Sequence, residues 1–218
     1  MAQAETLPLD DREAACSEAA FADVLRAAIG ALDANHVPYV LIGGVGSASL
    51  GRPRWTHDID VLVAPVDADR ALDALARAGF DPERTNPHWI FKATMDDVVV
   101  DIIFRTVGDV YLDDEMLGHA QGAEFCGVHV QVAAPEDQIV IKAIAHDEQS
   151  ARHWNDALSL IASTDIDWDY LLERSERGAR RVLSLLIYAQ ANDLIVPSGT
   201  IERLFAHIYG QESSDGGA

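Results

Sequence analysis

Two aspartates, Asp58 and Asp60, begin an apolar run that reads DIDVLV. If this run is a β-strand, side chains two residues apart project from the same face, so both carboxylates point the same way. Carboxylates this close repel each other and raise each other's pKa unless a cation lies between them. Because Mg²⁺ prefers a few carboxylate oxygens together with substrate phosphates, the pair predicts a divalent-metal site.

A third acid, Asp101, lies inside the apolar run VVVDIIF, where an unpaired carboxylate is unfavourable. One interpretation is a structural ion pair with Arg54 or Arg105. The other is that the two acid-bearing strands are neighbours, so that three carboxylates converge on a two-metal site with ions roughly 3.5 to 4 Å apart. Such a site suits phosphoryl or nucleotidyl transfer, and it requires the three carboxyl groups to lie within about 10 Å of one another.

A glycine-rich turn, with Gly43, Gly44 and Gly46, follows the apolar run that precedes the acids. Glycines let backbone N–H groups approach a phosphate closely, and Ser47 adds a hydroxyl donor. The turn nearly matches the GxGxxG dinucleotide fingerprint, but its third glycine is absent and the following helix is cut short. Asp60 also begins its strand, whereas the ribose-binding acid of dinucleotide folds ends one. We therefore favour a triphosphate-binding turn.

Lys142 is one of two lysines and interrupts the apolar helical run IVIKAIA. In isolation a snorkelling lysine, with its stem packed and its ammonium in water, is the favoured interpretation. With a triphosphate expected nearby, a phosphate contact becomes the better one. Arg54 and Thr56 precede the acid pair and could brace it, Arg54 by pairing with a carboxylate and Thr56 by hydrogen bonding.

Other aromatic and basic residues suggest structural roles. Trp89 is expected in a core or interface. The basic cluster comprises Arg174, Arg177, Arg180 and Arg181. A solvated helix face is its favoured meaning, and an acceptor-binding surface is the alternative.

The periodicity of apolar residues predicts an α+β fold, with a small mixed β-sheet and flanking helices followed by an α-helical C-terminal part. Strands are expected at 37–42, 59–63, 89–94, 98–104 and 128–132, and helices at 21–32, 68–78 and 112–119, with a brief helix after residue 43 and a linker from residue 80. Further helices are expected at 135–146, 150–163, 167–176, 179–192 and 200–208. We place a first domain at 14–133, a helical domain at 134–210, and flexible tails at 1–13 and 211–218.

The composition limits the partners. Acidic residues outnumber basic ones by 36 to 16 among 218 residues, giving a formal charge of −20. This charge repels phosphates at long range, so we expect no non-specific nucleic-acid binding. Two cysteines without CxxC spacing indicate neither a disulfide scaffold nor a thiol metal site. No apolar run approaches the roughly 18 residues of a membrane span. A cytoplasmic protein without membrane contact is expected.

Together these motifs resemble the polymerase-beta-type nucleotidyltransferase superfamily, in particular its small bacterial toxin-type and antibiotic-modifying members. The resemblance rests on GG followed by GRPRWTHDID, and on the later aspartate between hydrophobic residues. Lys142 in EDQIVIKAIAH, and Arg152 and Asp156 in SARHWNDALSLI, are similar to later motifs of these proteins. The resemblance covers most of residues 37–162. Many relatives carry Gly-Ser where this chain has Gly-Gly, so the serine contact to phosphate is either absent or supplied by Ser47.

The resemblance implies metal-binding roles for the acids. Asp58 and Asp60 would hold two Mg²⁺ ions, with Mn²⁺ as an alternative. Asp101 would hold the ion nearer the acceptor and take the acceptor's proton.

It also implies roles in binding the NTP. Gly43, Gly44 and Ser47 would line the triphosphate, and Lys142 would contact the β or γ phosphate. Asp156 would orient Lys142 or the acceptor.

We therefore expect a metal-dependent nucleotidyltransferase that moves NMP from an NTP to an acceptor hydroxyl and releases pyrophosphate. The acceptor could be a small molecule, a tRNA or a protein, as in toxin-antitoxin-like or antibiotic-modification-like enzymes. The acidic charge favours a cationic small molecule or a protein over RNA. The alternative is a catalytically silent module of the same fold that acts with a partner protein. The intact acids and Lys142 favour the enzyme.

Overall fold

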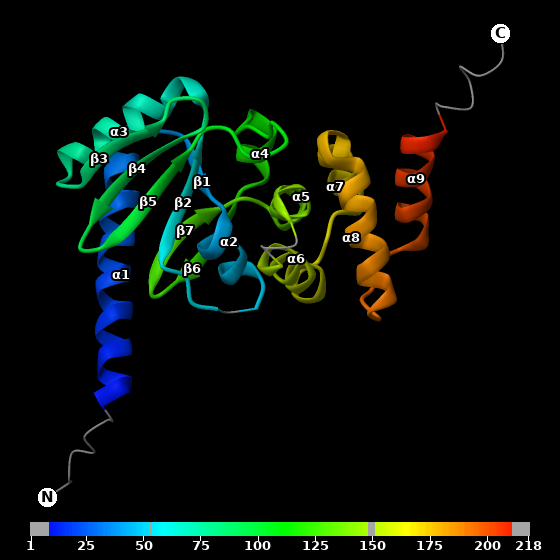
Figure 1. Cartoon of the computed structure of the whole chain (residues 1–218), viewed down its shortest axis with the longest axis horizontal. Coiled ribbons are helices and arrows are strands. Elements are labelled where there is room, and N and C mark those ends of the chain that lie inside the picture. The colour runs from blue at the N-terminus through cyan, green and yellow to red at the C-terminus, as the bar shows by residue number, and fades with distance from the viewer. Residues whose placement is uncertain (1–8, 53, 148–150, 211–218) are drawn as a thin grey trace, which may run out of the picture.

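The chain folds around a seven-stranded mixed β-sheet with the strand order β3-β4-β5-β2-β1-β7-β6 (Figure 1). The computed structural model describes residues 9–52, 54–147 and 151–210. The strands are β1 (Tyr39–Leu41), β2 (Asp58–Val63), β3 (Asp81–Asn86), β4 (Ile90–Met95), β5 (Val98–Ile103), β6 (Gln121–Phe125) and β7 (Val128–Val132). The predicted class, a mixed sheet with flanking helices and a helical C-terminal part, is confirmed.

Strand β2 lies near the centre of the sheet, antiparallel to β1 and parallel to β5. Its side chains alternate between the two faces, as the period of a β-strand requires. Ile59, Val61 and Val63 are buried in the main hydrophobic core. Asp58 and Asp60 therefore project from the opposite face of the sheet.

Two helices, α1 (Leu9–Ala34) and α3 (Ala68–Arg77), cover the face that carries the main core (Figure 1). A short 3₁₀ turn, η1 (Pro65–Asp67), leads into α3. Leu25 of α1 and Leu75 of α3 are completely buried, and burying one such side chain contributes about 1.5–3 kcal/mol. This layer fixes the strands from one side and leaves the acid-bearing face for other elements.

The opposite face is only partly covered, by α4 (Asp114–His119) and α5 (Pro135–Ala145), while α2 (Gly43–Leu50) follows β1 and packs Val45 and Ala48 into the main core. A smaller apolar cluster joins α4 and α5 to the sheet through Ile42, Leu62, Met116 and Ile141. The acids lie beside this cluster and are not buried beneath it, so a ligand can reach them.

The C-terminal helices pack around a separate apolar cluster to one side of the sheet (Figure 1). They are α6 (Arg152–Ser163), α7 (Trp168–Arg174), the 3₁₀ turn η2 (Ser175–Gly178), α8 (Ala179–Ala191) and α9 (Ser198–Tyr209). Helix α5 contributes Ile139 to this cluster and Ile141 to the sheet-side cluster. It therefore connects the two parts of the chain, and we retain the division near residue 134 as a proposal. No helix in the described ranges is both long enough and apolar enough to cross a membrane.

Three local predictions were wrong. The expected linker after Phe80 contains β3, and β6 was not predicted. Both strands lie at the edges of the sheet, and most of their side chains are exposed, so they lack the apolar alternation that identifies a strand. Helix α1 begins at Leu9, inside the segment expected to be a loose tail. The other predicted tail residues, 1–8 and 211–218, lie outside the described residues, as does the predicted start of a helix at 150.

The prediction of a solvated basic helix face is also wrong for Arg174, because its side chain is only 11% exposed. Its Nε lies 2.6 Å from Asp137 Oδ1, and its Nη1 lies 2.8 Å from Asp113 Oδ2. The Tyr170 hydroxyl donates to the other Asp137 oxygen at 2.8 Å. Burial raises the pKa of Asp137, while Arg174 and Tyr170 act in the opposite direction. This network connects α7 to α5 and to the start of α4.

Replacing Arg174 with Met should destabilise the fold strongly, because the Asp137 carboxylate is only 1% exposed and would lose its cation. Removing one partner of a buried pair typically lowers the free energy of unfolding by about 3–5 kcal/mol. Urea unfolding measures this change, with the exposed Arg177→Met variant as the matched control. Equal stability of the two variants would contradict the structural role of Arg174.

Candidate active site

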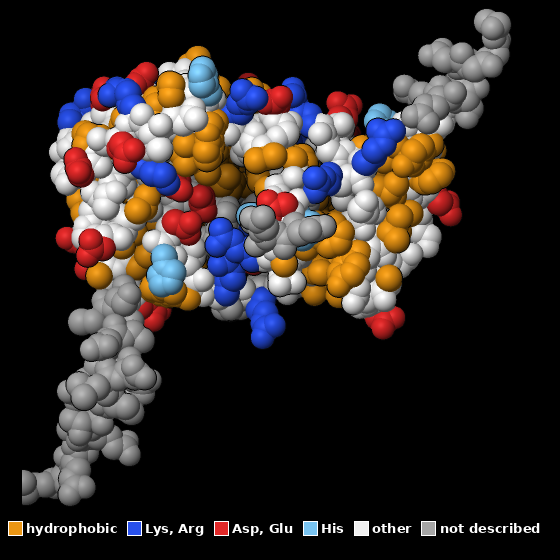
Figure 2. Space-filling view, in the orientation of Figure 1, with side chains coloured by type: hydrophobic (Ala, Val, Ile, Leu, Met, Phe, Trp, Pro, Cys, Tyr) orange, Lys and Arg blue, Asp and Glu red, His pale blue; other side chains and the backbone are white. Residues whose placement is uncertain are grey.

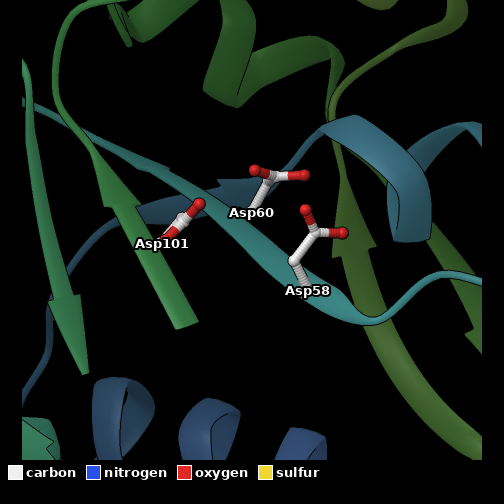
Figure 3. Close-up of side chains that lie close together, drawn as sticks. All are labelled: Asp58, Asp60 and Asp101. Carbon is white, nitrogen blue, oxygen red and sulfur yellow. The ribbon is translucent and has the colours of Figure 1, made fainter. Parts of the chain in front are cut away.

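Three aspartates converge on the open face of the sheet, as the sequence predicted. Strands β2 and β5 are parallel neighbours, and Asp60 stands directly opposite Asp101 in their register. One carboxylate oxygen from each of Asp58, Asp60 and Asp101 lies within 4.8 Å of the others. Figure 3 shows the three carboxyl groups on adjoining strands, on the same side of the sheet. The prediction that these groups lie within about 10 Å is confirmed.

The electrostatics of this cluster call for a cation. Burial, followed by the neighbouring charges of Asp58 and Asp101, raises the pKa of Asp60 to about 6 from 3.8. A hydrogen bond from the Gly44 backbone N–H opposes the shift. The Thr56 hydroxyl donates to Asp58 Oδ1 at 2.6 Å and fixes that carboxylate, which confirms the hydrogen bond predicted for it. Three close carboxylate oxygens are a donor set that suits Mg²⁺ or Mn²⁺.

The glycine turn lies against the acid strand at van der Waals limits. Gly43 has a φ of +61°, and a Cβ at this position would stand 1.8 Å from Asp60 Oδ2. A Cβ on Gly44 would stand 2.2 Å from the Thr56 hydroxyl oxygen. Glycine is therefore required at both positions, by space and, at Gly43, also by backbone conformation. The turn places the N-terminus of α2 beside the acids.

Ser47 lies beneath this turn and not on the surface of the site. Its side chain is buried, and its hydroxyl donates to the Gly43 carbonyl oxygen at 2.7 Å. Among the described residues, those that line the cavity include Gly43 and Gly44 but not Ser47. The structure thus places the predicted triphosphate-binding serine where it supports the turn.

Asp156, on α6, binds two cations at once. Arg54 donates from Nε and Nη2 to its two oxygens at 2.8 Å each, and Lys142 Nζ donates to Oδ2 at 2.8 Å. Burial raises the pKa of Asp156, but the hydrogen bonds and charges of Arg54 and Lys142 outweigh it and lower the pKa overall. Lys142 is 3% exposed. Burial lowers its pKa, and Asp156 opposes that shift.

These contacts exclude one sequence-based interpretation of Lys142 and one of Arg54. Lys142 does not snorkel to water, because its ammonium is held inside the protein by Asp156. Arg54 pairs with Asp156 and not with the metal-site acids. The ion pairs connect α5 and α6 to the loop before β2, and so they join the helical part to the site.

A cavity of about 360 Å³ brings these residues together. The acids, the glycine turn, Arg54, Thr56 and Lys142 all line it, as do Arg152 and His153 of α6. In Figure 2 acidic and basic side chains meet near the middle of the face shown, with hydrophobic side chains beside them. A volume of this size matches a small-ligand pocket.

Lys92 and Trp89 line the cavity but were not predicted as site residues. Lys92 stands opposite Asp101 in the β4–β5 register, and its Nζ lies 2.5 Å from Asp101 Oδ1. Neither expected partner of Asp101 is used, since Arg105 pairs with Asp109 at 2.6 Å. Trp89, expected in a core or an interface, is 44% exposed in the turn before β4 and lines the cavity. The strand register, which the sequence does not show, brings Lys92 to Asp101.

A mixed sheet with two acids on one strand, a third on its parallel neighbour and a glycine turn beside them defines a nucleotidyltransferase-type site. A protein-family model described as "Uncharacterised nucleotidyltransferase" matches residues 4–194. The chain therefore belongs to this nucleotidyltransferase family, whose enzymes transfer an NMP group from an NTP. No sequence among the curated proteins matches the chain.

Solved structures share the fold. An antigenic nucleotidyltransferase-like protein from Paracoccidioides brasiliensis has a TM-score of 0.54 and 16% identity, over 85% of this chain and 92% of that chain. The antibiotic-resistance factor ANT(2'')-Ia has a TM-score of 0.50 and 15% identity, over 90% and 95% of the two chains. At these identities the similarity shows the fold alone.

The raised pKa of Asp60 predicts a pH-dependent response to Mg²⁺. Its folded value of about 6 exceeds 3.8, so the metal-free folded state binds more protons between these values and loses stability as the pH rises through them. Mg²⁺ must displace this proton at low pH. Differential scanning fluorimetry should therefore show a larger Mg²⁺-induced rise in Tm at about pH 7.5 than at about pH 5.

The Asp60→Asn variant serves as the control, since it carries neither the charge nor the proton. It should show little response to Mg²⁺ at either pH. An equal response of the wild-type protein at both pH values would contradict the assignment of Asp60 to the metal site.

Proposed function

We propose that this protein is a metal-dependent nucleotidyltransferase that transfers NMP from an NTP to an acceptor hydroxyl. The observation that carries the proposal is the convergence of Asp58, Asp60 and Asp101 within 4.8 Å, in the same cavity as the glycine turn and Lys142. A cluster of three acids beside a glycine turn suits metal-assisted in-line transfer at a phosphorus atom.

The acids divide the work of metal binding and proton transfer. Asp58 and Asp60 would hold Mg²⁺ or Mn²⁺. Asp101 would also bind the ion nearer the acceptor. The bound ions would supply charge neutralisation at the α-phosphate and align the acceptor with it. In the transfer, the acceptor oxygen forms a bond to the α-phosphorus, the bond to the β-phosphate bridging oxygen breaks, and pyrophosphate leaves. The acceptor's proton passes to the Asp101 carboxylate.

The triphosphate is assigned to the side of the cavity formed by the glycine turn and α5. Gly43 and Gly44 bring backbone close to the acids without a side chain in the way. Lys142 of α5 lines the cavity and provides a cation on this side, and its bond to Asp156 holds its ammonium in place. Ser47 acts indirectly, because its hydroxyl fixes the Gly43 carbonyl.

Incubation with Mg²⁺, each α-labelled NTP and cell extract tests the proposal. The wild-type protein should transfer label to a component of the extract. Asp60→Asn should abolish transfer together with the Mg²⁺-dependent nucleotide shift in Tm. Asp101→Asn should retain the shift but lose about 10²–10⁴-fold in rate, because the general base is removed while the other acids remain.

The variants separate catalysis from simple binding. Absence of label transfer and of any nucleotide-dependent change in Tm would overturn the enzyme proposal and favour a silent binding module. Transfer by Asp101→Asn at the wild-type rate would remove the role of this residue as the proton acceptor.

A further inference from the structure

The cavity has two chemically different halves. The charged half contains the acids, the glycine turn, Arg54 and Lys142. The other half is largely apolar, with Lys92 and Thr106 as its polar members, while Gln138 of α5 and Arg152 and His153 of α6 line the same cavity. Its apolar members are Trp89, Ile90, Ile103, Val107, Ile141 and Ala145.

The order of strands places the apolar half on the acceptor side. From β1 to β2, β5 and β4, the sheet presents the glycine turn, then Asp58 and Asp60, then Asp101, and finally Lys92. Since the triphosphate is assigned to the glycine turn, the acceptor must approach Asp101 from the β4 side. This step rests on the proposed function.

The acceptor side holds no uncompensated acid among its described residues. Asp101 is paired with Lys92, and Asp109 at the rim is paired with Arg105. A polycationic acceptor would therefore find no carboxylate for its ammonium groups, apart from the metal-binding acids. The excess of acidic over basic residues, which gives the whole chain a formal charge of −20, is therefore not found among the residues described on the acceptor side.

The acceptor side of the cavity is formed by a loop that is held in place and exposes apolar surface. Val107 is 65% exposed, and with Trp89, Thr106 and Gly108 it also lines an adjoining hollow of about 410 Å³, whose two charged members, Arg105 and Asp109, are paired with each other at 2.6 Å. The loop that carries Val107 is closed by a hydrogen bond from the Thr106 N–H to the Val110 carbonyl at 3.0 Å. Gly108 packs against α5, where a Cβ would stand 2.6 Å from an Ile144 carbon. Burying this exposed surface under a ligand is favourable.

We propose that the acceptor is an uncharged small molecule whose reactive hydroxyl is attached to an apolar ring or chain. The apolar body packs on Trp89 and Val107 and extends into the adjoining hollow. Its hydroxyl reaches Asp101, gives up its proton there and takes the NMP group as pyrophosphate leaves. This assignment replaces the cationic acceptor that the overall charge favoured.

Binding of N-phenyl-1-naphthylamine, an uncharged apolar fluorophore, tests the pocket without requiring turnover. The wild-type protein should bind it, and Val107→Glu should weaken binding at least about tenfold because a carboxylate would then enter the apolar wall. Ile195→Glu is the matched control, since Ile195 is 88% exposed on the connection between α8 and α9. It should bind the probe as the wild type does.

Competition and turnover then define the acceptor. 2-Phenylethanol, whose hydroxyl is attached to an apolar chain and ring, should displace the probe and accept label from the NTP, while glucosamine and tobramycin should do neither at the same concentration. Equal probe binding by Val107→Glu and wild type, no probe binding at all, or stronger displacement by the amino compounds would each overturn the proposal.

The nucleotide-dependent shift in Tm separates this proposal from the proposed function. A shift without probe binding would overturn the acceptor assignment alone. Probe binding without any shift would overturn the proposed function, and the acceptor assignment with it.

Discussion

The mutual repulsion of three carboxylates is the constraint on which this structure depends. Asp58, Asp60 and Asp101 lie within reach of one ion, and although Lys92 pairs with Asp101, the charges of Asp58 and Asp101 add to the effect of burial in raising the pKa of Asp60. A protein that needed only stability would separate these groups or pair each with a base. Their position beside a cavity is consistent with the cation site proposed above.

The neighbouring structure is adapted to this cluster. Gly43 and Gly44 cannot carry side chains, because Asp60 and Thr56 occupy the space that a Cβ would need. Asp156 forms ion pairs with both Arg54 and Lys142. The helical part therefore holds the Lys142 ammonium in place beside a site whose acids come from the sheet. The two parts of the chain are therefore joined at the place where the proposed chemistry occurs.

Sequence reasoning identified the residues that a strand period or a glycine turn can reveal. The paired acids and the glycines could be read locally, and Asp101 was conspicuous as a charge in an apolar run. The partner of Asp101 could not be read, because Lys92 meets it only through the β4–β5 register. Arg174 resembled a surface residue, since its buried partner Asp137 lies in a helix far away in sequence. Edge strands β3 and β6 carry mainly exposed side chains, so no regular alternation of buried apolar residues identifies them.

The central claim is that the three acids hold the ion that acts on a nucleotide. Anomalous diffraction from crystals grown with Mn²⁺ and a non-hydrolysable ATP analogue tests it directly. We expect a manganese peak within about 2.0–2.6 Å of carboxylate oxygens of Asp58 and Asp60, with the analogue's phosphates beside the glycine turn. A bound nucleotide whose manganese lies away from these acids would contradict their role as metal ligands.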